Sequence, residues 1–264
     1  MALFVAVASG CQPPPPPPGP PTGRCKPNPF TEQVQRDLDA RGAAAHHLTA
    51  AVYDDRSGCW YHLRRGQRVT TASVVKIEIM AAALLRAQDQ HRALTDWELD
   101  RIKPMIHASD DPSASALWGS LGGAGGMSAY GTRLGLHATV EVEPKWGLTT
   151  TTAEDQAAFI HRLLQGNVLQ PAGRTQAWWQ LLDIRGDQRW GVRAGVPSDW
   201  QVGHKNGFFD SACCGWRVNS VGYVSDPDGG GYSIAILSDG WRSLGDGVPM
   251  VEAVAIAVAN SLVK

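Results

Sequence analysis

One segment of the sequence, from Ser73 to about Gln88, constrains the fold more than any other because it is apolar on nearly every side when drawn as a helix. Its apolar residues are Val74, Val75, Ile77, Ile79, Met80, Ala81, Ala82, Ala83, Leu84 and Leu85. A helix that is apolar all round lies inside a protein core or a membrane. This segment is shorter than the roughly 20 residues that cross a bilayer. The rest of the chain must therefore surround it.

The remaining hydrophobic pattern predicts strands near both ends of the chain and helices between them. Helices are expected over 31–41, 95–107, 112–121, 127–134, 152–164, 171–182 and 247–262, and strands over 48–53, 59–63, 200–204, 216–224 and 232–237. Thr151 and Glu154 have the spacing of a capping box for the helix over 152–164. This order predicts an α+β fold, an antiparallel five-stranded sheet flanked by helices with an inserted all-helical lobe. A site is expected in the cleft between the lobes.

The composition excludes several classes of protein. The sequence has 264 residues, 43% of them hydrophobic, and its 24 Lys and Arg against 25 Asp and Glu give a formal net charge of -1. The basic residues form no stripe, so nucleic acid is not an expected partner. No fixed repeat is present, which excludes a solenoid. Neither C-x-x-C nor H-E-x-x-H occurs, so we expect no metal site and no cofactor.

The N-terminus places a short apolar run and several small residues before Cys11, in the order MALFVAVASGC. This order is typical of export signals that end at a lipidated cysteine, although no Lys or Arg precedes the run. We expect residues 1–11 to be a signal or lipoprotein-type segment, residues 12–29 a proline-rich linker and residues 30–264 the folded domain. The protein would then be extracytoplasmic, either secreted or anchored to the cell membrane through Cys11. The alternative is a frayed tail with a chance cysteine.

Four cysteines remain besides Cys11, namely Cys25, Cys59, Cys213 and Cys214. They allow up to two disulfides. Cys213 and Cys214 are not expected to bridge to each other, because a disulfide between neighbours strains the intervening peptide.

Ser73 and Lys76 begin the apolar helix with S-x-x-K spacing, which puts the hydroxyl and the amine on one face, one turn apart. A serine hydroxyl becomes a nucleophile when a neighbouring base removes its proton, and a lysine can do so when burial and positive charge lower its pKa. The start of a helix adds N–H donors that favour a developing anion. The alternative interpretation is a capping serine and a lysine whose amine reaches the surface.

Two further motifs favour the catalytic interpretation. Ser109-Asp110-Asp111 precedes Pro112, a residue typical of the first helical turn, so its side chains would lie at a helix N-terminus. Lys205-Asn206-Gly207 is expected to end a late strand, where the glycine would let a substrate lie close to the backbone. The chain has only six lysines, and two of them are Lys76 and Lys205.

In this order the three motifs resemble those of the class A serine β-lactamases and the penicillin-binding D,D-peptidases, which carry S-x-x-K, S-D-N and K-T-G. The resemblance extends from Thr31 to Lys264 and includes residues 94–99, the threonines 149–152 and the segment Ser238-Asp239-Gly240. It looks closest to exported serine hydrolases of actinobacteria. The resemblance implies the fold of that superfamily and hydrolysis of an amide, β-lactam or peptide through an acyl-enzyme, by a monomer without a cofactor.

The resemblance also implies roles for individual residues. Ser73 would be the acylated nucleophile, Lys76 its proton acceptor and Ser109 a proton relay towards the leaving group. Lys205 would supply positive charge for a substrate carboxylate and would lower the pKa of Lys76. The backbone N–H groups of Ser73 and Phe208 would form the oxyanion hole.

Asp111, Asn206 and Gly207 would contact the substrate, and the sequence departs from the family pattern at the first two of them. Asp111 stands where the family has Asn, and Asn206 replaces Thr or Ser. Glu143 resembles the residue that activates the deacylating water in class A enzymes, but its loop is shortened, and the alternative is a surface carboxylate. These departures leave open a second function, a lipoprotein that binds cell-wall peptides or a partner on the same fold without turnover.

Overall fold

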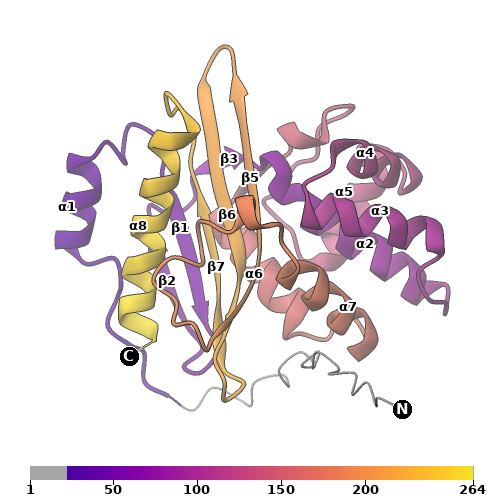
Figure 1. Ribbon diagram of the computed structural model, residues 1–264, viewed down its shortest axis with the longest axis horizontal. Coiled ribbons are helices and arrows are strands. Elements are labelled where there is room, and N and C mark those ends of the chain that lie inside the picture. The colour runs from indigo at the N-terminus through magenta and orange to yellow at the C-terminus, as the bar shows by residue number, and fades with distance from the viewer. Residues whose placement is uncertain (1–22, 264) are drawn as a thin grey trace, which may run out of the picture.

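The computed structural model describes residues 23–263. Figure 1 shows a central sheet with α1 and α8 on one side and a helical lobe on the other. The helices are α1 (Glu32–Ala40), α2 (Val75–Asp89), α3 (Asp96–His107), α4 (Asp111–Ser120), α5 (Gly123–Leu134), α6 (Ala153–Leu164), α7 (Pro171–Leu182) and α8 (Leu244–Leu262), with the 3-10 turns η1 (Ala72–Val74), η2 (Trp146–Leu148) and η3 (Gly186–Gln188). The strands are β1 (Thr49–Asp54), β2 (Cys59–Leu63), β3 (Arg68–Thr70), β4 (Thr150–Thr152), β5 (Gln201–Ser211), β6 (Gly215–Ser225) and β7 (Gly231–Leu237). The predicted α+β architecture is confirmed.

The main sheet has the strand order β2-β1-β7-β6-β5, and every neighbouring pair is antiparallel. Successive residues of a strand point to opposite faces. In β7, Ile234 and Ile236 pack in the core that α8 covers, whereas Ala235 and Leu237 pack in the core of the helical lobe. The sheet therefore separates two hydrophobic cores. Strand β5 forms one edge of this sheet, and β2 forms the other.

Helix α2 is the buried helix that the sequence predicts. Twelve of its fifteen residues are buried, including Lys76 and Glu78, and α3, α4, α5 and α7 pack around it. Its N-terminus meets the sheet, because η1 contacts β5 and β6. The S-x-x-K motif therefore lies where the helical lobe meets the edge of the sheet.

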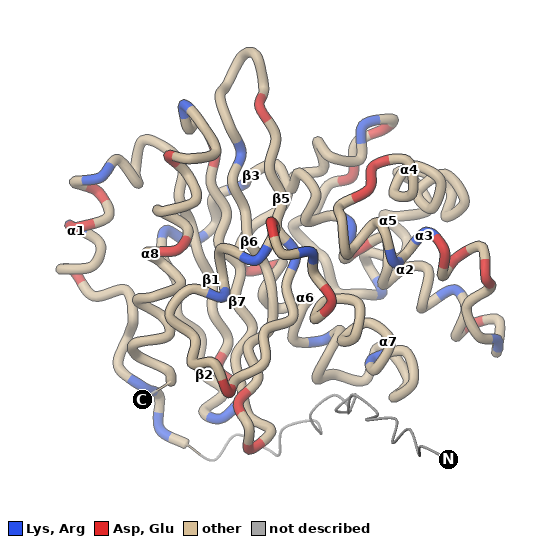
Figure 2. Tube along the Cα trace, in the orientation of Figure 1, with Lys and Arg blue, Asp and Glu red and all other residues tan. Residues whose placement is uncertain are grey.

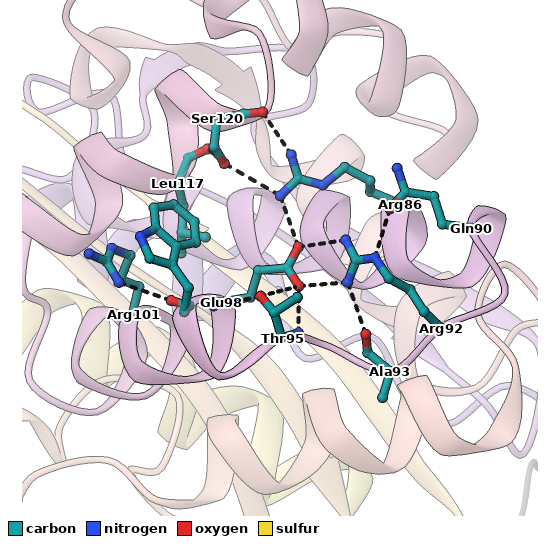
Figure 3. Close-up of polar contacts among 10 residues, drawn as sticks. Arg86, Gln90, Arg92, Ala93, Thr95, Glu98, Arg101, Leu117 and Ser120 are labelled. Carbon is teal, nitrogen blue, oxygen red and sulfur yellow. Dashed lines mark hydrogen bonds and ion pairs between the residues drawn. The ribbon is translucent and has the colours of Figure 1, made fainter.

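The carboxylate of Glu98 links α3 to α2, and Arg86 extends this network to the end of α4 (Figure 3). The carboxylate accepts hydrogen bonds from Arg86 of α2 at 2.9 Å and from Arg92 at 2.7 and 3.0 Å, and it closes a capping box with Thr95. Arg86 also donates to the carbonyl of Ser120 at the end of α4. Burial raises the pKa of Glu98, but the hydrogen bonds from Arg92, Thr95 and Arg86 outweigh it and hold the pKa at about 2.

Several element boundaries differ from the sequence-based expectation. Strand β5 continues to Ser211, so Lys205-Asn206-Gly207 lies inside it rather than at its end. The cap of α6 is Thr152, which accepts from the N–H of Asp155, and Glu154 instead accepts from the N–H of Gly66 at 3.0 Å. The predicted capping box is therefore wrong, because the residue that caps the helix is Thr152 rather than Thr151. The two-stranded sheet of β3 and β4 was not predicted.

The last part of the expected linker is attached to the domain. Cys25 and Cys59 form a disulfide, and the hydroxyl of Tyr61 donates to the carbonyl of Lys26 at 3.1 Å. Ser261 donates to the carbonyl of Pro27 at 2.5 Å. The folded part of the chain thus begins before the expected boundary at residue 30. The predicted signal segment, Cys11 and most of the predicted linker lie outside the described residues.

Cys213 and Cys214 also form a disulfide with each other, so the prediction that they would not is wrong. The pair lies at the tip of the β5–β6 hairpin, which projects beyond the rest of the molecule (Figure 1). The chain reverses there between the paired residues Ser211 and Gly215, and Gly215 has a φ of 71°. This tight turn places the two side chains within bonding distance.

Acidic and basic residues alternate over both lobes, with no cationic stripe in the part of the chain that Figure 2 colours by charge. Among the described residues, no helix combines the length and the apolar character needed to cross a membrane.

Candidate active site

Ser73 lies in η1, immediately before α2, in a backbone that is held in an unusual conformation. The preceding residue, Ala72, has a φ of 50°, in the left-handed region that L-residues rarely adopt. Strand β5 approaches this turn closely, because a Cβ added to Gly207 would lie 2.9 Å from the backbone nitrogen of Ser73 and 2.7 Å from that of Val74. Only glycine fits there, and its presence brings the edge strand against the start of the helix.

Lys76 lies one turn further along and is fully buried. Its Nζ is 3.0 Å from Ser73 Oγ, 2.6 Å from Asp111 Oδ1, and 2.7 and 3.1 Å from the carbonyl oxygen and Oγ of Ser109. The carbonyl and the carboxylate can only accept hydrogen bonds. These two acceptors take two N–H groups of Lys76. The third position on Nζ, which is an N–H in the charged form and the lone pair in the neutral form, therefore faces the hydroxyl groups of Ser73 and Ser109.

This arrangement suits a base when Lys76 is neutral. Its lone pair then faces the hydroxyls and can receive the proton of Ser73. Burial lowers the pKa of Lys76, and the carboxylates of Asp111 and Asp110 oppose that shift without cancelling it. The lysine therefore loses its proton more readily than a lysine in water.

Ser109 connects Lys76 to Lys205. It has a φ of 60°, a second left-handed non-glycine residue in the site, and strain of this kind collects at functional sites. Lys205 Nζ donates to Ser109 Oγ at 3.0 Å and to the carbonyl of Asn206 at 2.8 Å. Burial and the neighbouring Lys76 hold the pKa of Lys205 well below its usual value. Lys205 is fully buried, and its expected role of supplying charge for a substrate carboxylate stays a prediction.

A pocket of about 420 Å³ opens above Ser73. Its lining includes Ala72 and Ser73 of η1 and Asp111 and Ser115 of α4. The rest comes from the loop before β4 and from β5, namely Pro144, Lys145, Trp146, Gly147, Leu148, Phe208 and Phe209. A larger groove of about 1010 Å³ between α2, α3 and α7 contains none of the motif residues. We therefore assign the smaller pocket as the candidate site.

Asn206 does not contact this pocket. Its amide donates to the carbonyls of Gln188 and Trp190 at 2.7 and 3.3 Å, and its Oδ1 accepts from Ser220 at 2.6 Å. The side chain of Asn206 is therefore bonded within the protein, and its expected role in binding substrate stays a prediction. This placement follows from strand alternation, since Lys205 and Gly207 point to one face of β5 and Asn206 points to the other.

Glu143 makes its hydrogen bonds with residues that do not line the pocket. Its Oε2 accepts from the N–H of Ala124 at 2.7 Å and from Trp118 Nε1 at 3.2 Å. The carboxylate thus binds the first turn of α5, where a negative charge is favourable, and it does not line the pocket. Of the two interpretations, the geometry favours the surface carboxylate.

Trp146 is a site residue that the motifs did not reveal. Its Nε1 donates to Ser115 Oγ at 3.1 Å, and Lys76 Nζ lies 4.9 Å from the centre of its ring. A single aromatic residue in a loop has no periodicity, so nothing in the local sequence marks it. Ser115 could have been found, because it follows Asp111 at i+4 on the same helical face.

Within the described part of the chain, no three His, Cys, Asp or Glu side chains are grouped so that they could hold a metal ion.

Comparison with known proteins supports a family assignment. A model described as the beta-lactamase enzyme family matches residues 98–262, a range that holds the second and third motifs but neither Ser73 nor Lys76. A beta-lactamase of Mycobacterium tuberculosis is 28% identical, with 90% of this chain and 87% of the relative covered. A protein of Mycobacterium bovis named as lipoprotein LppW is 27% identical, with 73% of this chain and 63% of the relative covered.

Solved structures show the same fold. A variant of the last common ancestor of Gram-negative class A beta-lactamases has a TM-score of 0.75 at 24% identity, covering 86% of this chain and 95% of that structure. A beta lactamase from Xanthomonas campestris has a TM-score of 0.74 at 24% identity, covering 88% of this chain and 99% of that structure. The fold, the order of the motifs and a family match over more than half of the sequence agree, and the chain belongs to the beta-lactamase enzyme family.

Proposed function

We propose that the protein is an exported serine hydrolase that forms an acyl-enzyme at Ser73 and acts on an amide, β-lactam or peptide substrate. The observation that supports this most is the contact between Lys76 Nζ and Ser73 Oγ at 3.0 Å. The carbonyl of Ser109 and the carboxylate of Asp111 accept the other two N–H groups of the amine. A hydroxyl in hydrogen-bond contact with a buried amine is the arrangement that activates a nucleophilic serine.

In the proposed reaction, neutral Lys76 takes the proton of Ser73 as Oγ attacks the substrate carbonyl. The N–H groups of Ser73 and Phe208 stabilise the resulting oxyanion. The tetrahedral intermediate then collapses, the bond to the leaving group breaks, and the proton passes from Lys76 through Ser109 to the leaving nitrogen. Ser109 suits this relay because its Oγ lies 3.1 Å from Lys76 Nζ and 3.0 Å from Lys205 Nζ.

Deacylation is the slow step in this proposal. Among the residues that line the pocket, the one carboxylate is Asp111, and it is paired with Lys76. Glu143 is bound to α5 instead. Without a well-placed base for water, the acyl-enzyme persists. Because Lys205 is buried, we assign recognition of a substrate carboxylate to Lys145, the lysine that lines the pocket.

Mass spectrometry of the intact protein with benzylpenicillin tests this proposal. We expect one covalent adduct that maps to Ser73, is absent from Ser73→Ala and decays over hours rather than seconds. A failure of the wild type to react with either benzylpenicillin or a fluorophosphonate, or an adduct of equal yield on Ser73→Ala, would contradict it.

A second candidate function is a lipoprotein that binds peptides without turnover. The ion pair between Lys76 and Asp111 favours it, because a lysine held as an ammonium cannot accept a proton. The similarity to a protein named as a lipoprotein supports export and membrane anchoring for either candidate. The two differ in the reactivity of Ser73, which only the hydrolase requires.

A further inference from the structure

Asp111 presents a carboxylate to the pocket in an unusual way. Its side chain is 70% exposed, although its partner in the ion pair, Lys76, is fully buried. Lys76 Nζ contacts Oδ1 at 2.6 Å. Within residues 23–263, Oδ2 receives no hydrogen bond. One oxygen therefore faces the base of the proposed reaction, and the other is available to a ligand.

The fold holds this carboxylate in place. Asp111 is the first residue of α4, and Asp110 caps the helix by accepting from the N–H of Ser113 at 2.8 Å. One turn later on the same face, Ser115 fixes the indole of Trp146. Asp111, Ser115 and Trp146 thus form one wall of the pocket that contains Ser73.

This wall favours a cation and disfavours a carbonyl. A carboxylate can only accept hydrogen bonds, so a carbonyl oxygen of an acylated amine beside Oδ2 would meet another acceptor. A primary ammonium would donate a charge-assisted hydrogen bond there, and an indole ring close by adds a favourable interaction with a cation. Lys76 already lies over that ring at 4.9 Å.

An ammonium at Asp111 would also act on the base. The carboxylate of Asp111 stabilises the charged form of Lys76. A ligand cation that pairs with the same carboxylate supplies an alternative counter-ion and repels the charge on Lys76. The proton of Lys76 then passes to solvent more readily, which leaves the neutral amine that Ser73 requires.

We propose that the pocket selects substrates with a free primary ammonium next to the carbonyl that Ser73 attacks, and that this ammonium activates the site by pairing with Asp111 and thereby favouring the neutral form of Lys76. This inference rests on the proposed function, because it assumes that the reacting carbonyl lies at Ser73.

The test uses two thioesters of alanine that differ only at nitrogen, one with a free α-amine and one N-acetylated. Acylation of Ser73 is followed by stopped-flow release of the thiol. We expect the wild type to favour the amine, and Asp111→Asn to reduce the ratio of the two rate constants by about tenfold or more, the size of a lost hydrogen bond to a charged group. Asp110→Asn is the matched control, because it removes a neighbouring charge, keeps a good capping residue and leaves the ratio unchanged.

The pH profile supplies a second readout. At saturating ester, the acylation rate of the wild type should reach half its maximum at a lower pH with the amine than with the N-acetyl compound, and the two profiles should coincide in Asp111→Asn. The preference for the amine should fade above about pH 8, where an α-amine loses its charge.

Labelling with a fluorophosphonate, which carries no amine, separates the two proposals. If Ser73 is labelled but the wild type favours the N-acetyl ester, reacts with neither ester, or keeps its ratio in Asp111→Asn, this inference is wrong and the proposed function stands. If Ser73 reacts neither with the fluorophosphonate nor with either ester, both are wrong.

Discussion

Lys76 makes four polar contacts within 3.1 Å, one more than an ammonium group has hydrogens. Two of the four acceptors, the carbonyl of Ser109 and the carboxylate of Asp111, are satisfied in either protonation state. The two hydroxyls then compete for one N–H of the ammonium, or one of them donates to the lone pair of the amine. The protonation state of this single residue therefore decides whether Ser73 is a nucleophile.

Labelling of Ser73 by a fluorophosphonate should depend on pH through Lys76. The rate should rise with pH as the lysine loses its proton, with a midpoint below the usual lysine pKa of about 10.4, because burial lowers the pKa of Lys76. Since Asp111 opposes that shift, Asp111→Asn should move the midpoint to lower pH. A midpoint that is unchanged or higher in this variant would show that Asp111 does not control the base.

Glu143 should have little influence on turnover. Because its carboxylate binds the first turn of α5 and Trp118, Glu143→Gln should leave the lifetime of a penicillin adduct unchanged and should lower the free energy of unfolding by about 1 kcal/mol, the size of a lost helix cap. Intact-mass time courses and urea denaturation measure the two effects. Rapid turnover in the wild type that disappears in Glu143→Gln would instead identify Glu143 as the base for deacylation.

The motifs predicted some of the site's residues but not its shape. S-x-x-K spacing correctly places Ser73 beside Lys76, and Ser109, Asp111 and Lys205 join them. Strand alternation, applied to the third motif, would have placed Asn206 on the face of β5 opposite to Lys205. The wall formed by Trp146 depends on how an irregular loop packs, and a single sequence carries no signal for that.

At the scale of elements, long periodic segments were predicted well and short ones were not. The helix over 171–182 begins and ends at the predicted residues, where Pro171 occupies the first turn and Trp178 and Leu181 are buried at helical spacing. Strands β3 and β4 have three residues each, which is too short to show alternation. The strand over 200–204 was predicted to end too early, since β5 continues to Ser211. Gly207 was expected to let a substrate lie close to the backbone, whereas in the structure it lets β5 approach Ser73.

The network around Glu98 should stabilise the helical lobe in a pH-dependent way. Its pKa of about 2 in the folded protein lies below the ordinary value of 4.5, so the contribution is fully present above about pH 4.5 and is lost as the pH falls towards 2. At neutral pH, Glu98→Gln should reduce the free energy of unfolding by about 2 kcal/mol.

Urea denaturation of wild type and Glu98→Gln between pH 7 and pH 3 measures this contribution. The difference between them should shrink as the pH falls. Asp100→Asn, a change at an exposed position of the same helix, serves as the control and should have almost no effect. A difference that is constant with pH would contradict the ionic character of the network.

On the scale of the whole molecule, the N-terminal segment leaves the domain beside β2, because the Cys25–Cys59 disulfide attaches it there. Residues 1–22 precede this point and include Cys11 and six consecutive prolines. An extended proline tract spans about 3 Å per residue, so it would hold the domain away from a surface to which Cys11 is attached.

Membrane association should therefore depend on Cys11. Expressed with its N-terminus intact in a bacterium that processes lipoproteins, the wild type should partition into the detergent phase and Cys11→Ala should remain in the aqueous phase. Cys25→Ser, which removes a cysteine of the domain instead, should partition like the wild type. Equal partitioning of the wild type and Cys11→Ala would contradict the lipid anchor.

The most direct measurement of the central claim is the site of covalent labelling by a fluorophosphonate, mapped by tandem mass spectrometry on the intact full-length protein. A serine reacts at a useful rate only when a neighbouring group activates it. The account predicts one adduct, on Ser73, formed at least about 100-fold more slowly in Lys76→Ala, the effect expected for loss of a general base. No adduct on the wild type, an adduct on another residue, or equal labelling of Lys76→Ala would contradict it.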